Sequence, residues 1–144
     1  MSKYAQGKYT IQNLEKYVGK GTPTYRSSWE FCFMRFLDTN PNVLQWASES
    51  IHIPYRNPLT GKNTIYVPDF FMYYQDAKGN KHGELIEVKP SKEMAMENAR
   101  SARDKAMVAI NMAKWEAARA FCKGMGITFR VISESDIFHQ GKKR

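Results

Sequence analysis

Two acidic residues and a lysine lie near the middle of the chain, inside segments that are otherwise apolar. Asp69 follows Pro68 in the run YVPDFFMYY, and Glu87 and Lys89 lie in the run GELIEVKP. Burying a charged group costs free energy unless an opposite charge or a metal ion compensates it. The residue types in these two runs therefore predict a site where such compensation takes place.

The spacing of the two acids predicts that they face one another. The polar run 76–80 is typical of a turn between two strands, and it is centred on Lys78. In a regular antiparallel pair around this centre, facing residues have numbers that sum to 156, as those of Asp69 and Glu87 do. Facing side chains share one face of the sheet, with Cβ atoms roughly 5 Å apart.

The lysine joins the same cluster. Glu87 and Lys89 are two residues apart on one strand and point to the same face, whereas Val88 points to the other. Pro68 has no N–H group for the sheet, so we expect a bend or a bulge just before Asp69. Two like charges this close repel one another unless a cation lies between them or one of them binds a proton.

An alternative interpretation of Glu87 and Lys89 is an exposed charge pair on the strand. That strand also contains Leu85, Ile86 and Val88 and is the most apolar of the predicted strands. Because such a strand is an unfavourable place for charges without a function, the sequence favours a site.

A third carboxylate, Glu30, comes from a predicted helix at 27–38. Ser27 and Glu30 have the spacing of a capping box, in which the glutamate would accept a hydrogen bond from the backbone at the start of the helix. In helical projection, however, Glu30 falls between Met34 and Leu37, at the centre of the apolar side. This position favours a glutamate that points over the sheet toward the other two acids.

The pattern of apolar residues and breakers predicts one domain built on a mixed sheet. The predicted elements are a short helix at 10–18, the helix at 27–38, strands at about 46–55, 64–75 and 81–89, a helical region at 91–123 that could restart at Ser101, a strand at 127–132 and a helical turn at 133–138. The predicted fold class is α/β, with an α-β-β-β-α-β core whose last strand arrives by a helical crossover.

The net charge of +8 is concentrated at the two ends of the chain. Residues 1–26 carry five bases and one acid, residues 139–144 carry three bases, and residues 27–138 carry 14 bases and 13 acids. The sequence is therefore divided into a basic N-terminal arm, a main domain and a basic tail. Basic ends favour binding to a polyanion, most commonly a nucleic acid, although they can also serve solubility alone.

The predicted DNA contacts are basic residues of the N-terminal arm and one lysine of the long helix: Lys3, Lys8, Lys16, Lys20, Arg26 and Lys114. Tyrosines alternate with the N-terminal bases, a mixture that suits contacts with both backbone and bases. The two cysteines provide no disulfide framework, and no apolar run approaches the roughly 18 residues of a membrane span. Without the apolar core of a signal peptide, the chain is predicted to be cytosolic.

With these residues in place, the sequence resembles the PD-(D/E)XK, or restriction-endonuclease-like, nuclease superfamily. The residues that match are Pro68-Asp69 and Glu87-Val88-Lys89, with Glu30 in the preceding helix. Within that superfamily, residues 25–138 are similar to TnsA-like endonucleases and to the small head-completion nucleases of tailed phages, through the runs YRSSWEFCF, VPDF, IEVKP and GITFRVISESDI and a helix that bears Trp115. The small size favours the phage group.

The resemblance implies a metal-dependent phosphodiesterase. Asp69, Glu87 and the Val88 carbonyl would bind Mg²⁺, with Mn²⁺ as a substitute, and Glu30 would complete the site or help to hold a second ion. Lys89 would orient the attacking water or stabilise the transition state. Related nucleases often add a residue from the next helix, for which Asn111 and Lys114 are the candidates here.

The resemblance further implies a DNA endonuclease that trims or nicks DNA during head completion, in the host cytoplasm or within the virion. Its expected partners are DNA and phage head or portal proteins, with no membrane, and the pattern is compatible with a homo-oligomer. Two alternatives stay open: a catalytically silent DNA-binding or structural head-closure protein, and a nuclease subunit of a transposition or recombination complex.

Overall fold

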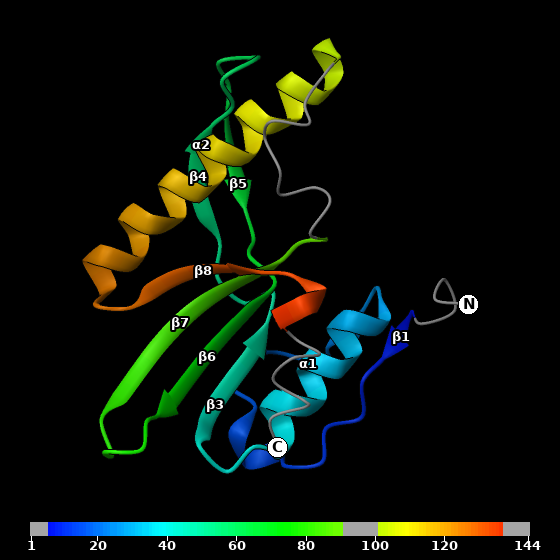
Figure 1. Cartoon of the computed structure of the whole chain (residues 1–144), viewed down its shortest axis with the longest axis vertical. Helices are drawn as coiled ribbons and strands as arrows, with labels where there is room; N and C mark the ends of the chain where they lie inside the picture. The colour runs from blue at the N-terminus through cyan, green and yellow to red at the C-terminus, as the bar shows by residue number, and fades with distance from the viewer. Residues whose placement is uncertain (1–5, 91–100, 137–144) are drawn as a thin grey trace.

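The computed structural model describes residues 6–90 and 101–136, and its centre is a four-stranded sheet. The strands lie in the order β3 (Val43–Ser48), β6 (Phe70–Gln75), β7 (Lys81–Val88) and β8 (Thr128–Ile132). β3, β6 and β7 are antiparallel neighbours, and β8 lies parallel to β7 (Figure 1). The mixed sheet confirms the predicted α/β fold class.

Two long helices cover opposite faces of this sheet (Figure 1). α1 (Ser28–Thr39) begins after Ser27, whose side chain accepts a hydrogen bond from the backbone of Glu30, and so confirms the predicted cap. α2 (Ala102–Met125) begins after Ser101, which was the predicted restart, and ends at Gly126 in the left-handed conformation that glycine favours. The predicted part of this helix at 91–100 lies outside the described residues.

Two predicted strands are wrong in one respect, because each is divided in two. The segment 46–55 separates into β3 and β4 (Ile53–Arg56), since Glu49 adopts a positive φ of 49° and turns the chain. The segment 64–75 separates into β5 (Asn63–Tyr66) and β6 at Pro68, where a bend was expected. β4 and β5 form a separate hairpin that packs beside α2 (Figure 1).

The register of β6 and β7 is the predicted one. Pairing runs from Phe70 opposite Ile86 to Gln75 opposite Lys81, so facing residue numbers sum to 156. The turn between these strands is fixed by Asp76, whose Oδ1 accepts hydrogen bonds from the backbone N–H groups of two turn residues at 2.9 Å each. Local turn chemistry therefore determines which residues face one another across the hairpin.

The core consists of two apolar clusters, one on each face of the sheet. Ile86 belongs to the cluster under α1, while its neighbour Leu85 belongs to the cluster that includes Ala118 and Cys122 of α2. A strand that is buried on both faces reads as a continuous apolar run, which explains the composition of β7.

The N-terminal segment packs against the domain. β1 (Gly7–Lys8) pairs with β2 (Thr24–Tyr25), and the backbone of Val18 donates to the Trp46 carbonyl at 2.9 Å. The predicted helix at 10–18 is wrong: only a 3₁₀ turn, η2 (Leu14–Lys16), forms. The N–H groups of residues 12 and 13 are instead hydrogen-bonded to the side chain of Asp38, which holds this part of the chain in a loop.

The rings of three tyrosines in this segment pack against other aromatic residues of the domain. Tyr9 is buried, Tyr17 packs edge-on against Trp46, and Tyr25 packs edge-on against Phe31. The rings of Tyr9, Tyr17 and Tyr25 thus have a role in packing, and Tyr4 lies outside the described residues. Among the helices of the described residues, no candidate span long and apolar enough for a membrane is found. The predicted tail 139–144 lies outside the described residues.

Candidate active site

Asp69 lies at the point where the chain enters β6, and hydrogen bonds hold it on two sides. Its carboxylate Oδ2 accepts a hydrogen bond from the Val88 N–H at 2.8 Å, and its main-chain carbonyl accepts one from the Glu49 N–H at 2.9 Å. β6 begins only at Phe70, so the Asp69 side chain satisfies the Val88 N–H beyond the last ladder pair. The carboxylate is thereby fixed beside β7, next to the residues predicted to act with it.

Glu87 lies one residue beyond the last β6–β7 pair and is held by a tyrosine. The Tyr66 hydroxyl donates a hydrogen bond to Glu87 Oε1 at 2.7 Å, and Lys114 Nζ of α2 lies 5.6 Å from the centre of the Tyr66 ring. Burial raises the pKa of Glu87, although the Tyr66 hydrogen bond and the charges of Lys89 and Lys114 act in the opposite direction. Both predicted lysines therefore lie within electrostatic reach of this carboxylate.

Asp69 and Glu87 form an interacting pair. Burial raises the pKa of Asp69, the negative charge of Glu87 raises it further, and the hydrogen bond from Val88 opposes both only in part. Without a cation, the pair therefore favours the uptake of a proton at a pH where an ordinary carboxyl group is charged. This is the electrostatic signature expected of a site that receives a positive charge.

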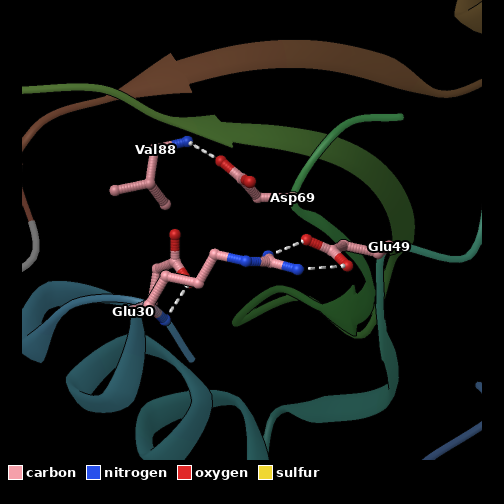
Figure 2. Close-up of polar contacts among 5 residues, drawn as sticks. Glu30, Glu49, Asp69 and Val88 are labelled. Atoms are coloured by element: carbon pink, nitrogen blue, oxygen red, sulfur yellow. Dashed lines mark hydrogen bonds and ion pairs between the residues drawn. The ribbon is translucent and has the colours of Figure 1, made fainter. Parts of the chain in front are cut away.

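Glu30 combines the two roles that the sequence left open. Its backbone N–H donates to Ser27 Oγ at 3.1 Å, and its Oε1 accepts a hydrogen bond from the Arg26 N–H at 2.9 Å. Its other carboxylate oxygen points toward Val88 and Asp69 (Figure 2). Burial raises the pKa of Glu30. Its charge in turn contributes to the raised pKa values of Asp69 and Glu87, so the three acids share one electrostatic environment.

Sequence reasoning missed two residues at this site, Tyr66 and Glu49. Tyr66 lies three residues before Asp69 in a run of aromatics, where nothing in the pattern separates a ligand-holding tyrosine from a core one. Glu49 lies in the turn after β3, and its carboxylate pairs with the Arg26 guanidinium. Neither residue has a sequence signal, because each is brought to the site by the fold.

The predicted DNA contacts are dispersed. Lys8 and Lys20 are exposed, whereas Lys16 Nζ donates hydrogen bonds to the carbonyls of Asp38 and Asn40 at 3.0 and 2.8 Å. This contact at the C-terminal end of α1 is a structural role that the sequence did not reveal. Lys3 lies outside the described residues.

The donor atoms at the Asp69–Glu87 pair could hold a divalent cation. Among the described residues, no three histidine, cysteine, aspartate or glutamate side chains are grouped closely enough to hold an ion by themselves. Two carboxylates beside the main chain of Val88 nevertheless form an all-oxygen donor set, which fits Mg²⁺ because this ion usually binds one or two carboxylates and keeps several waters. The raised pKa values of both acids fit the same ion, because a cation would relieve their repulsion.

Two comparisons with known proteins find similarity to nucleases. The family described as "TnsA-like endonuclease N terminal" matches residues 40–134, a span that includes Asp69, Glu87 and Lys89 and leaves Glu30 outside. The "Head completion nuclease" of Enterobacteria phage T4 is 34% identical over 148 residues, which cover 95% of this chain and 96% of that protein. The predicted resemblance is confirmed.

Proposed function

The chain belongs to the TnsA-like endonuclease family, a group of restriction-endonuclease-like nucleases, and from that premise we propose that it is a divalent-cation-dependent DNA endonuclease of phage head completion. The nuclease class follows from the family. The role in head completion is supported by the T4 relative, which this chain matches along almost its whole length.

The observation that carries the proposal is the pair formed by Asp69 and Glu87. Both carboxylates are partly buried. Burial raises the pKa of each, and the charge of Glu87 raises that of Asp69 further, while a hydrogen bond to each acid acts in the opposite direction. A fold gains no stability from such a pair in the absence of a cation. The arrangement is therefore better explained by function than by packing.

In the proposed mechanism, Asp69, Glu87 and the carbonyl of Val88 hold Mg²⁺ or Mn²⁺. When bound, the ion supplies positive charge for the scissile phosphate and promotes the ionisation of a water. The Tyr66 hydroxyl donates to Oε1 of Glu87 and leaves Oε2 available to a cation that the site would hold. Asp69 is fixed in the same way, because one of its oxygens is used by the Val88 N–H.

Lys89 and Glu30 complete the set of groups that act on the substrate. Lys89 carries a compact positive charge two residues after Glu87, which suits it to stabilise charge that develops on the phosphate during attack by water. Glu30 projects from α1 and directs a carboxylate oxygen toward Asp69 (Figure 2). That oxygen is suited to accept a hydrogen bond from the attacking water.

The test is cleavage of supercoiled plasmid with Mg²⁺ or Mn²⁺ by the wild-type protein, Asp69→Ala and Lys89→Ala. The matched control is Glu84→Gln. Glu84 lies on β7, as Glu87 does, but its carboxylate is paired with Arg130. We expect each site variant to cut at least ~100-fold more slowly, and the control to cut like the wild type. Site variants that cut as well as the wild type would show that the chemistry lies elsewhere.

A second candidate is a nuclease subunit of a transposition complex, favoured by the match to the TnsA-like family. The near-complete overlap with the phage relative favours head completion instead. If the wild-type protein binds the plasmid but leaves it intact with every divalent ion, a structural head-closure protein becomes the better proposal.

A further inference from the structure

A continuous set of contacts connects Glu30 to Asp69 through two residues without an assigned catalytic role. The backbone N–H of Arg26 donates to Glu30 Oε1 at 2.9 Å, and the Arg26 guanidinium pairs with the Glu49 carboxylate. The backbone N–H of Glu49 then donates to the Asp69 carbonyl at 2.9 Å. The ion pair therefore lies between the Glu30 carboxylate on α1 and the main chain of Asp69, just before β6. Figure 2 shows the ion pair beside both acids.

The backbone at Glu49 supports a specific role for this residue. Its φ of 49° is the only positive value at a non-glycine position in the described part of the chain. Glycine and asparagine adopt this conformation at lower cost, and strained residues that persist in a fold concentrate at functional sites. A glutamate at this position keeps a carboxylate next to Arg26 at the expense of backbone strain.

Stability alone gives little reason for the pair. The Arg26 and Glu49 side chains are 57% and 38% exposed, and ion pairs at such positions contribute little to the free energy of unfolding. Catalysis is more sensitive, because small displacements of a reacting group lower the rate strongly. The effect of the pair should therefore appear in the rate of cleavage rather than in stability.

We propose that Arg26 and Glu49 are positioning residues whose ion pair holds Glu30 over the Asp69–Glu87 pair in the orientation that cleavage requires. This inference rests on the proposed nuclease function. It differs from the interpretation of Arg26 as a DNA contact, because a phosphate contact would give the guanidinium a role in substrate binding rather than in holding Glu30. The two interpretations predict different behaviour of Glu49 variants.

The experiment uses Arg26→Gln, Glu49→Gln and the double variant, with a duplex DNA substrate and Mg²⁺. Positioning predicts that each single change lowers kcat by about 10-fold with KM and DNA affinity unchanged. The double variant should be no worse than either single variant, because the changes break the same link. The exchanged pair, Arg26→Glu with Glu49→Arg, should recover part of the lost rate.

A DNA contact at Arg26 predicts the opposite pattern, which would overturn the inference. Arg26→Gln would then raise KM and weaken DNA binding at constant kcat, and Glu49→Gln would leave kcat unchanged. Glu49→Asn provides a control for folding, because asparagine tolerates a positive φ. We expect this variant to unfold at the wild-type temperature or above it while its kcat falls like that of Glu49→Gln.

Mn²⁺ affinity, measured by titration calorimetry without DNA, separates this inference from the proposed function. Positioning predicts that Arg26→Gln and Glu49→Gln both weaken Mn²⁺ binding. Each removes the ion pair that holds the Arg26 backbone against Glu30, and so loosens a carboxylate whose charge adds to the attraction for the ion. A direct charge effect alone would strengthen binding in the first variant and weaken it in the second. Affinities that move in opposite directions therefore refute the inference, whether or not the wild-type protein cuts DNA.

Discussion

Two aspartates in this molecule, the buried Asp38 and the half-buried Asp69, differ in their environment, and the difference separates a structural site from a functional one. Asp38 is 0% exposed. It accepts hydrogen bonds from the Tyr9 hydroxyl at 2.7 Å and from the N–H groups of Gln12 and Asn13 at 2.8 and 3.0 Å. Burial alone would raise the pKa of Asp38, but these donors outweigh it and lower the pKa.

Asp69 has the same functional group and the opposite electrostatics. Burial raises the pKa of Asp69, the charge of Glu87 raises it further, and the hydrogen bond from Val88 offsets them only in part. Burial is therefore not what marks a catalytic carboxylate in this fold. The distinction is whether the surroundings of the acid already stabilise its charge or leave that to a bound cation.

The largest expected effect is the loss of stability in Asp38→Asn. The amide cannot accept all three hydrogen bonds, so buried donors of the N-terminal segment lose their partner. We expect the free energy of unfolding to fall by about 3 kcal/mol, measured by urea denaturation. A loss that cannot be distinguished from zero would mean that this carboxylate does not hold the segment.

The same substitution at Asp69 should act in the opposite direction. Without divalent ions, Asp69→Asn removes one charge of a repelling pair, so we expect it to raise the free energy of unfolding at pH 8 by about 1–2 kcal/mol. Cleavage should be lost in the same variant. A lower free energy of unfolding in Asp69→Asn would mean that the Asp69 carboxylate stabilises the fold, as that of Asp38 does.

The two aspartates also predict opposite pH dependences in the metal-free wild type. Because the folded-state pKa of Asp69 is raised, the folded state binds more protons than the unfolded state above about pH 4, and stability falls as pH rises through the raised pKa. Asp69→Asn should flatten this slope. The contribution of Asp38, whose pKa is lowered, is present above about pH 4 and is lost as the pH falls below it.

The smallest effect is expected at Glu84, the other carboxylate on β7 besides Glu87. Glu84 pairs with Arg130 at 3.0 Å and accepts a hydrogen bond from the Tyr74 hydroxyl at 3.2 Å. Because Arg130 is partly exposed, Glu84→Gln should cost no more than about 1 kcal/mol in urea denaturation and leave cleavage unchanged. A large loss of activity in this variant would show that the functional region extends along β7 beyond Glu87.

The sequence predicts the parts of the site that depend on local rules. The length of the turn after Gln75 sets the register that brings Asp69 and Glu87 together. Helical periodicity places Glu30 on the side of α1 that faces the sheet. Helical periodicity does not predict the burial of the charged Asp38. Its donors come from a segment more than 20 residues earlier, and no local pattern encodes such a contact.

The same limit applies to Glu49 and Tyr66. Each reaches the site through a turn or a hairpin whose position relative to α1 depends on the packed sheet. The division of the strands at Glu49 and at Pro68 is related to this, because both breaks bring residues to the end of the sheet where the acids lie. The contacts missed by the sequence are therefore tertiary ones.

The five-residue turn between β6 and β7 also bears on the order in which the chain folds. Pairing across so short a loop has a low entropic cost of closure, whereas β3 and β8 join their neighbours over much longer stretches of chain. The hairpin that unites Asp69 and Glu87 is thus the most local pairing in the sheet. Because burial is the main cause of their raised pKa values, these acids would take up protons only as the rest of the domain packs around the hairpin.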